Sequence, residues 1–562
     1  MRAAVANRRI VLLALAFLAL LAAALGRAVW LQAVHGDAYA AMALRQHRET
    51  VAVPAQRGTI FDRNGEPLAI GRQAITVYAN PRQVRRARDL TLAAAEHLDA
   101  DPNLLYPLLR DRSRGFVYVA RKADPEEAER LRELGFAGVG FYPEEKRVYP
   151  QGRVAAQVLG YAGVDNKGLE GLERSLEEVL AGRPGRRTIV KDPLGRALDV
   201  VETRPESPGK NVRLTLDHQI QANAEEVLAE TVRRFGARAA TAIVMDPHTG
   251  AVLAMAVAPG FNANRFPVTR ADRRRNRAVT DTYEPGSTFK LVTVAAALEE
   301  GVVTPRTSFL LPPTIRVADR VIREAHARGT ERMSVREIVE YSSNVGTITI
   351  AKRLGEGRLA YWIDRFGFGR GTGIDFPGES PGFVLPLDQW SGSTIGTVPI
   401  GHGIAVTPIQ MARAYAAIAN GGVLVRPRLV ERVDGRPLPA ARGRRVVSRA
   451  VARKVLDMLR GVVLEGTGTE AAIPGYTVAG KTGTAAKIEP SGRYSHTRYV
   501  ASFVGLVPAT KPRLVIMVMV DEPHGSIYGG VVAAPAFRQI ARFNLQYLEV
   551  PPDAPEAARA TG

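Results

Sequence analysis

An uncharged hydrophobic run lies close to the N-terminus, at residues 10–26. Three arginines precede it: Arg2, Arg8 and Arg9. A run of about 17 residues is short for a transmembrane helix, but Arg27 and Trp30 behind it are residue types that suit the membrane interface. We expect residues 1–31 to form a cytoplasmic tail and a single membrane anchor, with the rest of the chain exported. A cleaved signal peptide, with its cleavage site near residues 22–24, is the alternative.

The region after the anchor alternates short apolar runs with turn and helix signals. Between residues 49 and 81 the apolar runs flank Asn64-Gly65, which is a strong β-hairpin signal. Further on, "DPEEAERLRELG" predicts a helix that Asp124 caps and Gly135 ends. A polar segment with Pro and Gly, "ETRPESPGKN", then indicates a domain boundary near residue 207. We therefore expect a first exported domain over residues 32–206.

The second domain, expected over residues 207–550, has strand patterns at both ends and helix patterns between them. It opens with a helix predicted from Asp217 and two apolar runs around a turn at residues 247–250. It closes with two strand-like runs within residues 499–523 and a helix near residues 534–548. This order predicts an α+β fold in which helices cover one antiparallel sheet. Residues 551–562 are expected to form a disordered tail.

Composition narrows the possible functions only a little. A chain of 562 residues is long enough for two or three domains. The net charge of +20 is compatible with nucleic acid, but no zinc-ligand spacing, RNP motif or long basic arm accompanies it, so we expect no nucleic-acid partner. The sequence has no cysteine, which excludes disulfides, thiolate catalysis and Cys-ligated metals.

The segment "GYTVAGKT" at residues 475–482 matches the phosphate-loop pattern G-x-x-x-x-G-K-[ST]. A phosphate loop lies between a strand and a helix, but Gly483 and Pro490 leave no room here for a helix of ordinary length. Residues 476–478 favour a strand instead. The interpretation is a strand that ends in Lys481-Thr482-Gly483-Thr484, and nucleotide binding is the less favoured alternative.

Two Ser-x-x-Lys patterns occur, of which the one at residues 207–210 contains Pro-Gly and is assigned to the linker. The other is in "YEPGSTFKLVTVAAALEEG", where Ser287 begins an apolar and therefore buried helix. Lys290 follows one turn later on the same face, with its amine within reach of the serine hydroxyl. A buried, neutral lysine can act as base for a serine nucleophile, and Lys481 is a candidate for the second cation that lowers its pKa. A capping serine with a surface lysine is the plain alternative.

A third element is "SVREIVEYSSNVG". Ser334 and Glu337 form a capping box that opens one helix, and residues 342–344 interrupt the pattern before a second apolar stretch. Taken alone, Asn344 is a helix cap. The joint occurrence of Ser-x-x-Lys, Ser-x-Asn and Lys-Thr-Gly, in this order, is typical of penicillin-recognising serine enzymes.

The sequence resembles the class B penicillin-binding proteins over nearly its whole length. The resemblance is carried by these stretches: "RGTIFDRNGEPLA", "KRVYPQGRVAAQVLG", "GLEGLE", "YEPGSTFK", "YSSNVG", "GHGIAVTPIQMARAYAAIANGG", "VAGKTGTAAK" and "YGGVVAAPAF". Among its branches, "GKTGTA" and the short first exported domain are most similar to the division-specific, septal type (FtsI type). Two departures are Ser343 in the middle of Ser-x-Asn, where β-lactamases have Asp, and His402 in "GHG", where Gln or Tyr is expected.

The resemblance implies a fold and a reaction. The fold is a single transmembrane helix, an elongated α+β pedestal domain of the dimerisation type, and a transpeptidase domain similar to serine β-lactamases. The reaction is peptidoglycan D,D-transpeptidation through an acyl-serine, with inhibition by β-lactam antibiotics. The implied catalytic residues are Ser287, Lys290, Ser342 and Lys481. The implied substrate-binding residues are Asn344, Thr482, Gly483 and Thr484, and the backbone N–H groups of Ser287 and Thr484 would form the oxyanion hole.

The implied partners are D-Ala–D-Ala stem peptides, β-lactams, the membrane, the lipid II polymerase FtsW and other division proteins. The implied place is the inner (cytoplasmic) membrane, with the catalytic domain outside the cytoplasm, and no cofactor or metal is expected. An elongation-type transpeptidase of the lateral wall, a serine β-lactamase and a non-catalytic scaffold of this fold are the alternatives.

Overall fold

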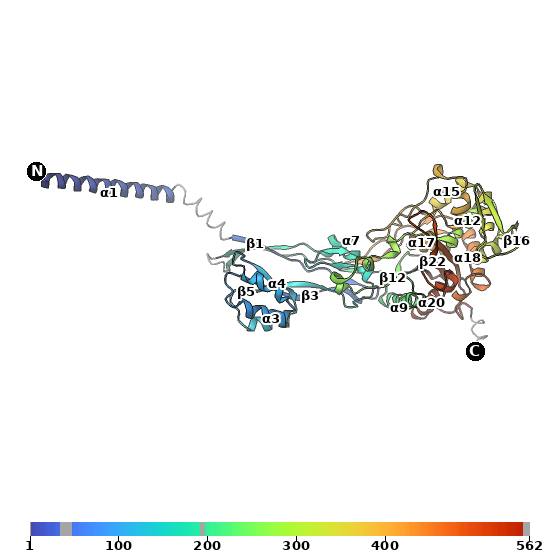
Figure 1. The fold of residues 1–562 in the computed structure, drawn as a ribbon, viewed down its shortest axis with the longest axis horizontal. Coiled ribbons are helices and arrows are strands. Elements are labelled where there is room, and N and C mark those ends of the chain that lie inside the picture. Colours follow the sequence, from blue (N-terminus) through green and yellow to red (C-terminus); the bar gives the residue numbers. More distant parts are fainter. Residues whose placement is uncertain (1, 34–47, 192–196, 555–562) are drawn as a thin grey trace. The chain divides into compact units, whose positions relative to one another are not determined.

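The computed structural model describes residues 2–33, 48–191 and 197–554 (Figure 1). Contacts within the chain define two compact units. The first combines residues 1–56 with 182–209, and the second combines residues 57–181 with 210–562.

The first unit contains the N-terminal helix and a small sheet. Helix α1 (Arg2–Ala33) includes a 26-residue stretch, Arg8–Ala33, in which an 18-residue segment has a mean hydropathy of 2.4 and no burial within the protein. By length and composition this helix can cross a membrane. The sheet is antiparallel in the order β1-β8-β9, with β1 at Arg48–Val53, β8 at Gly185–Lys191 and β9 at Ala197–Arg204.

A five-stranded antiparallel sheet forms the centre of the C-terminal region, in the order β12-β11-β23-β22-β21. Its strands are β11 (Ala239–Met245), β12 (Val252–Ala258), β21 (Ala479–Ile488), β22 (Tyr494–Val507) and β23 (Leu514–Asp521). Every residue of β11, β12 and β23 is buried. Burial on both faces requires a helical layer on each side of the sheet.

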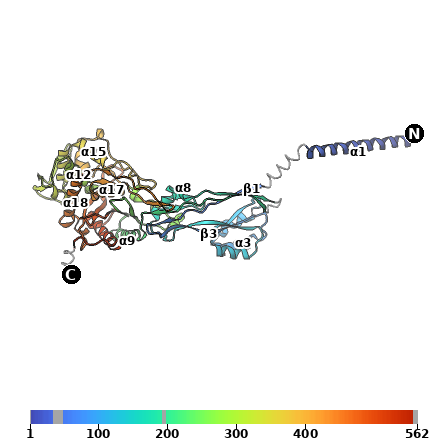
Figure 2. The same cartoon turned by 180° about the vertical axis from the view of Figure 1, so that it is seen from behind.

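Alternate residues of β11 belong to the two different cores that flank the sheet. Ala242 and Val244 belong to the core beneath α9 (His218–Phe235) and α20 (Ala534–Tyr547). Ile243 and Met245 belong to the larger core on the other face. Three helices supply much of that core: α12 (Lys290–Glu299), α17 (Pro408–Ala419) and α18 (Arg449–Leu464). Seen from behind, α9 lies apart from α12, α17 and α18 (Figure 2).

The pedestal is built on the long strand β3 (Pro67–Ala79), which pairs with β4 (Val117–Ala123) and β5 (Val139–Val148). Its helices are α3 (Ala87–Leu98), α4 (Pro102–Arg110) and α5 (Pro125–Glu133). Asp124 caps α5 and Gly135 follows it with φ +60°, as the sequence predicts. The predicted hairpin at Asn64-Gly65 also forms, between β2 (Ile60–Phe61) and β3.

The pedestal and the C-terminal region share one sheet. Strand β10 (Val212–Leu214) pairs with β2 on one side and with β18 (Val430–Val433) on the other. Next to this sheet, Glu173 accepts charge-assisted hydrogen bonds from Arg57 at 2.7 Å and Arg147 at 2.6 Å, and all three side chains are buried. All three residues belong to the pedestal, so the ionic cluster holds segments of the pedestal together, whereas the strand pairing through β10 joins the pedestal to the C-terminal region.

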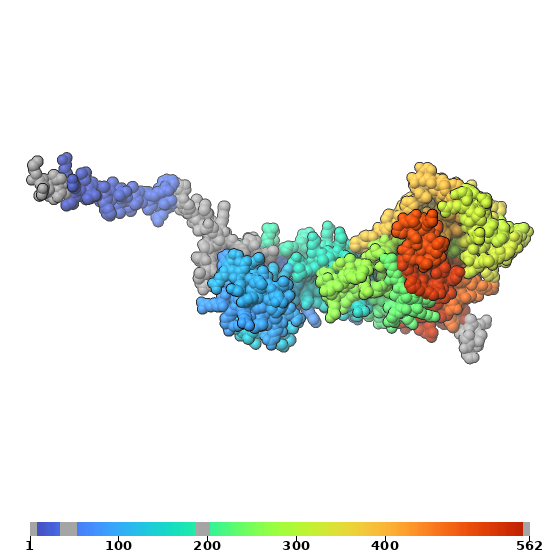
Figure 3. All heavy atoms as spheres, viewed as in Figure 1, coloured from blue at the N-terminus to red at the C-terminus, as the bar shows by residue number. Residues whose placement is uncertain are grey.

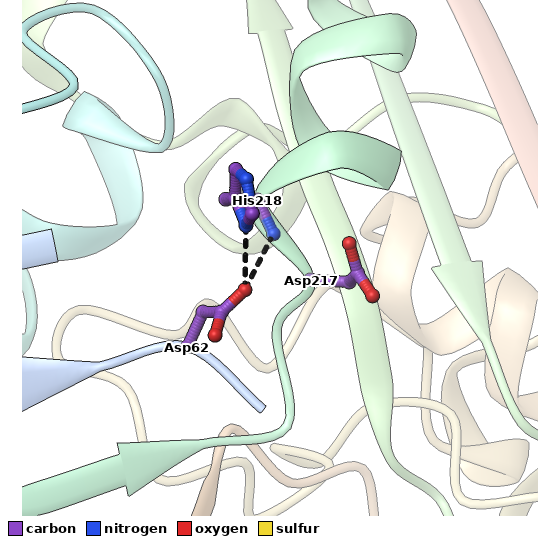
Figure 4. Close-up of side chains that lie close together, drawn as sticks. All are labelled: Asp62, Asp217 and His218. Atoms are coloured by element: carbon purple, nitrogen blue, oxygen red, sulfur yellow. Dashed lines mark hydrogen bonds and ion pairs between the residues drawn. The ribbon is translucent and has the colours of Figure 1, made fainter. Parts of the chain in front are cut away.

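The hairpin turn also contacts the start of α9 through Asp62, Asp217 and His218 (Figure 4). Asp62 Oδ2 lies 2.7 Å from His218 Nδ1, and Asp62 Oδ1 accepts from the backbone N–H of Asn64. Asp217 caps α9 by accepting from the N–H groups of its first turn, and it also accepts from the Asn64 side chain at 3.0 Å. Because these oxygens are engaged in hydrogen bonds, the group forms a structural junction.

Most of the predicted elements form where the sequence places them. The helix after Asp217, the pair of strands around residues 247–250, the two strands near the C-terminus and the final helix are all present. The predicted end of one strand is wrong. The strand at the Lys-Thr-Gly motif does not end there: it begins at Ala479 and continues to Ile488, because it pairs with β22 along its length.

Of the predicted tail, residues 555–562 lie outside the described residues, and Asp553 accepts a hydrogen bond from the Thr477 backbone at 2.7 Å.

Candidate active site

Ser287 lies in a single 3-10 turn, η2 (Gly286–Phe289), that leads into the buried helix α12. The sequence predicts one helix from Ser287, whereas the structure has this tighter first turn. Gly286 has φ +54°, and a Cβ atom there would lie 2.7 Å from the backbone oxygen of Thr484. Glycine at this position therefore lets the serine turn approach strand β21 closely.

Lys290 is the first residue of α12 and is fully buried. Its Nζ donates to the backbone oxygen of Ser342 at 2.6 Å, to Oγ of Ser342 at 3.2 Å and to Oδ1 of Asn344 at 2.7 Å. Within the described residues, no hydrogen bond joins this Nζ to Oγ of Ser287. The lysine thus links the helix of the nucleophile to the Ser-x-Asn motif, and all three ammonium protons have acceptors.

Burial lowers the pKa of Lys290 to about 7, against a smaller opposing effect of the Glu324 charge. The sequence predicts that apolar burial lowers this pKa and offers Lys481 as a candidate second cation that lowers it further. The two lysines are electrostatically coupled: burial first, and the charge of Lys290 second, lower the pKa of Lys481 well below its usual range. A lysine with a pKa near 7 loses its proton at neutral pH and can then accept one from a serine.

The Ser-x-Asn motif lies between α13 (Val335–Glu340) and α14 (Asn344–Leu354). The predicted capping box of Ser334 and Glu337 is present at the start of α13. Ser343, and not Asn344, caps α14 by accepting from the Gly346 N–H at 2.8 Å. This cap explains the serine in the middle of the motif and leaves the Asn344 side chain free for Lys290.

The backbone of Ser342 is in the left-handed region, with φ +60°. A non-glycine residue there costs roughly 1 kcal/mol or more, and such residues occur preferentially at functional sites. In this conformation the residue offers both its carbonyl and its hydroxyl oxygen to Lys290.

Glu324 holds the start of α14 from a different element. It follows β15 (Arg320–Arg323) and accepts from Oγ of Ser343 at 2.6 Å and from the N–H of Asn344 at 2.7 Å. Arg328 is its ion-pair partner. Burial raises the pKa of Glu324, but the hydrogen bonds from Arg328, Ser343 and Asn344 outweigh it and leave the pKa below its usual value. A buried carboxylate at this helix N-terminus fixes the orientation of the motif.

The Lys-Thr-Gly motif is in β21, the edge strand of the sheet. Thr482 and Thr484 face the same side, as alternation along a strand predicts, and Oγ1 of Thr482 lies 2.7 Å from Oγ1 of Thr467. A Cβ atom at Gly483 would lie 2.4 Å from Oγ of Ser502 and 2.9 Å from Cγ2 of Thr288. Glycine is thus required where strand and serine turn pack together.

The motifs meet at a cavity of about 680 Å³. Five of the predicted site residues line it: Ser287, Ser342, Asn344, Thr482 and Thr484. Lys290, Lys481 and Gly483 are buried outside its lining. Two further segments line the cavity: residues 325–326, which follow β15, and the hairpin of β21 and β22. These two chain segments lie side by side in Figure 3, coloured yellow-green and orange-red.

Three polar residues of this region are not found by the sequence motifs: Glu324, Thr467 and His326. They follow short strands or lie in loops without a recognisable pattern, and only the fold brings them to the cavity. His402 is noticed in the sequence as a departure, and the structure places it in the cavity wall.

A serine on a helix start, a buried lysine with a pKa near 7 and an edge strand with threonines define a serine acyl-transfer site. Comparison with known protein families supports this class of site. Residues 240–542 match the penicillin-binding protein transpeptidase domain, and residues 52–214 match the penicillin-binding protein dimerisation domain.

Similar proteins extend over almost the full chain. Peptidoglycan D,D-transpeptidase FtsI of Escherichia coli is 35% identical, with 97% of this chain and 91% of that protein covered. Probable peptidoglycan D,D-transpeptidase PenA of Neisseria gonorrhoeae is also 35% identical, with 99% and 95% covered. The crystal structure of penicillin-binding protein 3 from Mycobacterium tuberculosis in complex with aztreonam has a TM-score of 0.71 at 32% identity, with 90% of this chain and 99% of that chain covered.

The chain belongs to the class B penicillin-binding proteins. It combines their dimerisation and transpeptidase domains with an N-terminal helix that can cross a membrane, and it is an enzyme of the peptidoglycan D,D-transpeptidase type.

Proposed function

We propose that this protein cross-links peptidoglycan stem peptides in the septal wall through an acyl-ester on Ser287, and that β-lactams acylate the same serine. The observation that carries this proposal is the cavity in which Ser287 lies next to Ser342 and Asn344, above a lysine whose pKa is about 7.

In the first half-reaction, Oγ of Ser287 attacks the carbonyl carbon between the two D-Ala residues and gives its proton to the neutral amine of Lys290. The oxyanion is stabilised by the backbone N–H groups of Ser287 and Thr484, each worth about 10²–10³ in rate. As the tetrahedral intermediate collapses, the proton passes from Lys290 through Ser342 to the nitrogen of the leaving D-Ala. Lys290 already donates to Ser342, so this relay needs no rearrangement of the lysine.

The second half-reaction returns the enzyme to its starting state. An amine of a neighbouring stem peptide attacks the ester carbon, loses a proton to the Ser342–Lys290 pair, and forms the new amide as Oγ of Ser287 leaves and is reprotonated.

Substrate binding is assigned to the edge strand and to Asn344. Thr482 and Thr484 bind the terminal carboxylate, whose charge favours the protonated form of Lys481 beneath them. The substrate backbone adds to the free edge of β21 at Gly483. Asn344 uses Oδ1 for Lys290 and one N–H for the Arg323 carbonyl, which leaves its second N–H for the substrate amide.

The N-terminal helix supports a single-pass arrangement in the cytoplasmic membrane. Its first turns contain Arg2, Arg8 and Arg9, which favour the cytoplasmic side, so the catalytic region lies outside the cytoplasm. External protease should remove the bulk of the protein from intact spheroplasts; full protection would contradict this orientation.

The septal role and the partnership with the lipid II polymerase FtsW and other division proteins rest on the similarity to E. coli FtsI. Depletion should produce filaments with normal width. Round or widened cells would indicate the elongation-type role instead.

The decisive test of the activity is labelling of membranes with fluorescent penicillin. A labelled band at about 61 kDa should appear for the unaltered protein and be absent for Ser287→Ala at equal expression. Equal labelling of both proteins would refute the assignment of Ser287.

A further inference from the structure

His402 is placed in the wall of the active-site cavity by a contact between glycines. The N–H of Gly286 donates to the carbonyl of Gly401 at 3.1 Å, so the segment that contains His402 lies directly against the turn of the catalytic serine. Both Ser287 and His402 line the cavity, and the His402 side chain is 28% exposed.

A nearly buried carboxylate fixes the orientation of this imidazole. Nδ1 of His402 lies 2.8 Å from Oε2 of Glu284, whose side chain is only 9% exposed. The other oxygen of Glu284 accepts from the N–H of Gly403 at 2.8 Å and from the hydroxyl of Tyr494 at 3.1 Å. The ring of Tyr494 also packs edge-on against His402, with centroids 5.6 Å apart.

For a neutral imidazole, this arrangement sets which ring nitrogen carries the hydrogen. An ionised carboxylate only accepts, so Nδ1 of His402 must be the donor to Glu284. In the neutral imidazole the remaining nitrogen, Nε2, is then an acceptor. In the part of the chain that the structure describes, no hydrogen bond joins Nε2 of His402 to another protein atom.

The charge beside His402 favours a hydrogen-bond donor as the ligand of Nε2, whereas the buried Lys290 and Lys481 place positive charge at the Ser-x-Asn and Lys-Thr-Gly motifs. Among the described residues that line the cavity there is no lysine or arginine, while Glu470 is present and Glu284 stands behind His402. A carboxylate ligand at this position would be repelled by the Nε2 lone pair and by the negative charge of Glu284 behind the ring. An amine would be attracted by both.

We propose that His402, oriented by Glu284, is a binding subsite for a free amine of a stem peptide. This inference rests on the proposed transpeptidase function and adds to it the chemistry of the substrate. The amine has two sources, a side chain of the donor peptide or the attacking amine of the acceptor peptide, and the experiment separates them.

The test uses the full-length protein in detergent and thioester analogues of the donor peptide that acylate Ser287. The first arm compares donors with a free and with an acetylated side-chain amine, and measures the ratio of their acylation rates by intact mass. The second arm keeps the acetylated donor and varies the concentration of a D-amino acid acceptor. Because both acylation rates are measured on the same variant, their ratio is unaffected by a general loss of activity in that variant.

Four variants distinguish the proposed role of His402 from a general effect on the cavity. His402→Phe keeps a ring beside Tyr494 but has no acceptor, so we expect the free-amine preference, or the acceptor affinity, to fall roughly tenfold to a hundredfold. His402→Gln can donate to Glu284 and still accept from the amine, so it should retain most of the preference. Glu284→Gln can donate to Nδ1 and leave Nε2 protonated, so it should lose the preference although His402 remains. His326→Gln is the matched control, because His326 lines the same cavity without a carboxylate partner among the described residues.

A loss in the first arm assigns the subsite to the donor amine, and a loss in the second assigns it to the acceptor. If His402→Phe and His326→Gln behave alike in both arms, the proposal is wrong. That result would leave the acylation of Ser287 itself intact, so it is distinguishable from failure of the proposed function.

Discussion

Nζ of Lys290 lies 2.7 Å from Oδ1 of Asn344, so the lysine of the first motif is tied to the asparagine of the second. With its two contacts to Ser342, the amine has three acceptors and, as an ammonium, no lone pair for Ser287. Loss of one proton frees that lone pair. The protonation state of Lys290 therefore controls whether the site can attack a substrate.

Replacement of Lys290 should remove the base without unfolding the domain. Lys290→Ala is expected to slow acylation by penicillin by roughly 10²–10⁴. Lys290→Arg should do no better, because a guanidinium stays protonated. Stopped-flow or gel-based acylation rates measure the effect, and near-normal acylation by the arginine variant would show that another group is the base.

The acylation rate should rise with pH. Because burial brings the pKa of Lys290 to about 7, the neutral form that can accept a proton increases from about a tenth at pH 6 to about nine tenths at pH 8. The second-order acylation rate should follow this increase, with a midpoint near 7 and a plateau above 8. A profile that is flat from pH 5.5 to 8.5 would contradict the role of Lys290.

Glu324→Gln tests how the Ser-x-Asn motif is positioned. The negative charge of Glu324 raises the pKa of Lys290, so its removal should move the midpoint of the pH–rate profile to lower pH. The variant also weakens the contacts to Ser343 and Asn344, which should lower stability by about 1–3 kcal/mol. Destabilisation with an unchanged midpoint would mean that Glu324 is purely structural.

Gly483→Ala tests the close packing between strand β21 and the serine turn. The added Cβ atom would lie 2.4 Å from Oγ of Ser502 and 3.0 Å from the backbone oxygen of Pro285, so one of the two elements must shift. We expect a loss of about 1–3 kcal/mol in the free energy of unfolding and slower acylation. Gly329→Ala is the control, because no atom lies within 4 Å of a Cβ there. Equal stability of the two variants would refute the packing argument.

The sequence predicts the nucleophile and its lysine because a buried helix start leaves few other uses for Ser287 and Lys290. It also predicts that Thr482 and Thr484 share one face, since alternation along a strand is local. It does not predict how far β21 continues, because pairing with β22 decides that. Glu324 is beyond sequence reasoning because it reaches the motif only through the packing of a separate hairpin.

The lowered pKa of Lys290 is partly predictable from the sequence. The apolar helix that begins at Ser287 predicts burial of Lys290, and burial is the largest cause of the lowered pKa in the structure. The opposing effect of the Glu324 charge is not predictable, because only the fold brings that carboxylate to the site.

The lifetime of the penicillin adduct tests the central claim most directly. Hydrolysis of an acyl-serine requires a base that activates water, and class A β-lactamases use a glutamate for this purpose. Glu337 forms the cap of α13, and Glu340 lies at the end of that helix beside Arg336; among the described residues, Glu470 is the only acidic side chain in the cavity lining. Intact-mass spectrometry after removal of free drug should show one adduct per chain, located on Ser287 and stable for minutes or longer. Return of the unmodified mass within seconds, with a many-fold excess of hydrolysed drug, would contradict the account and indicate a β-lactamase.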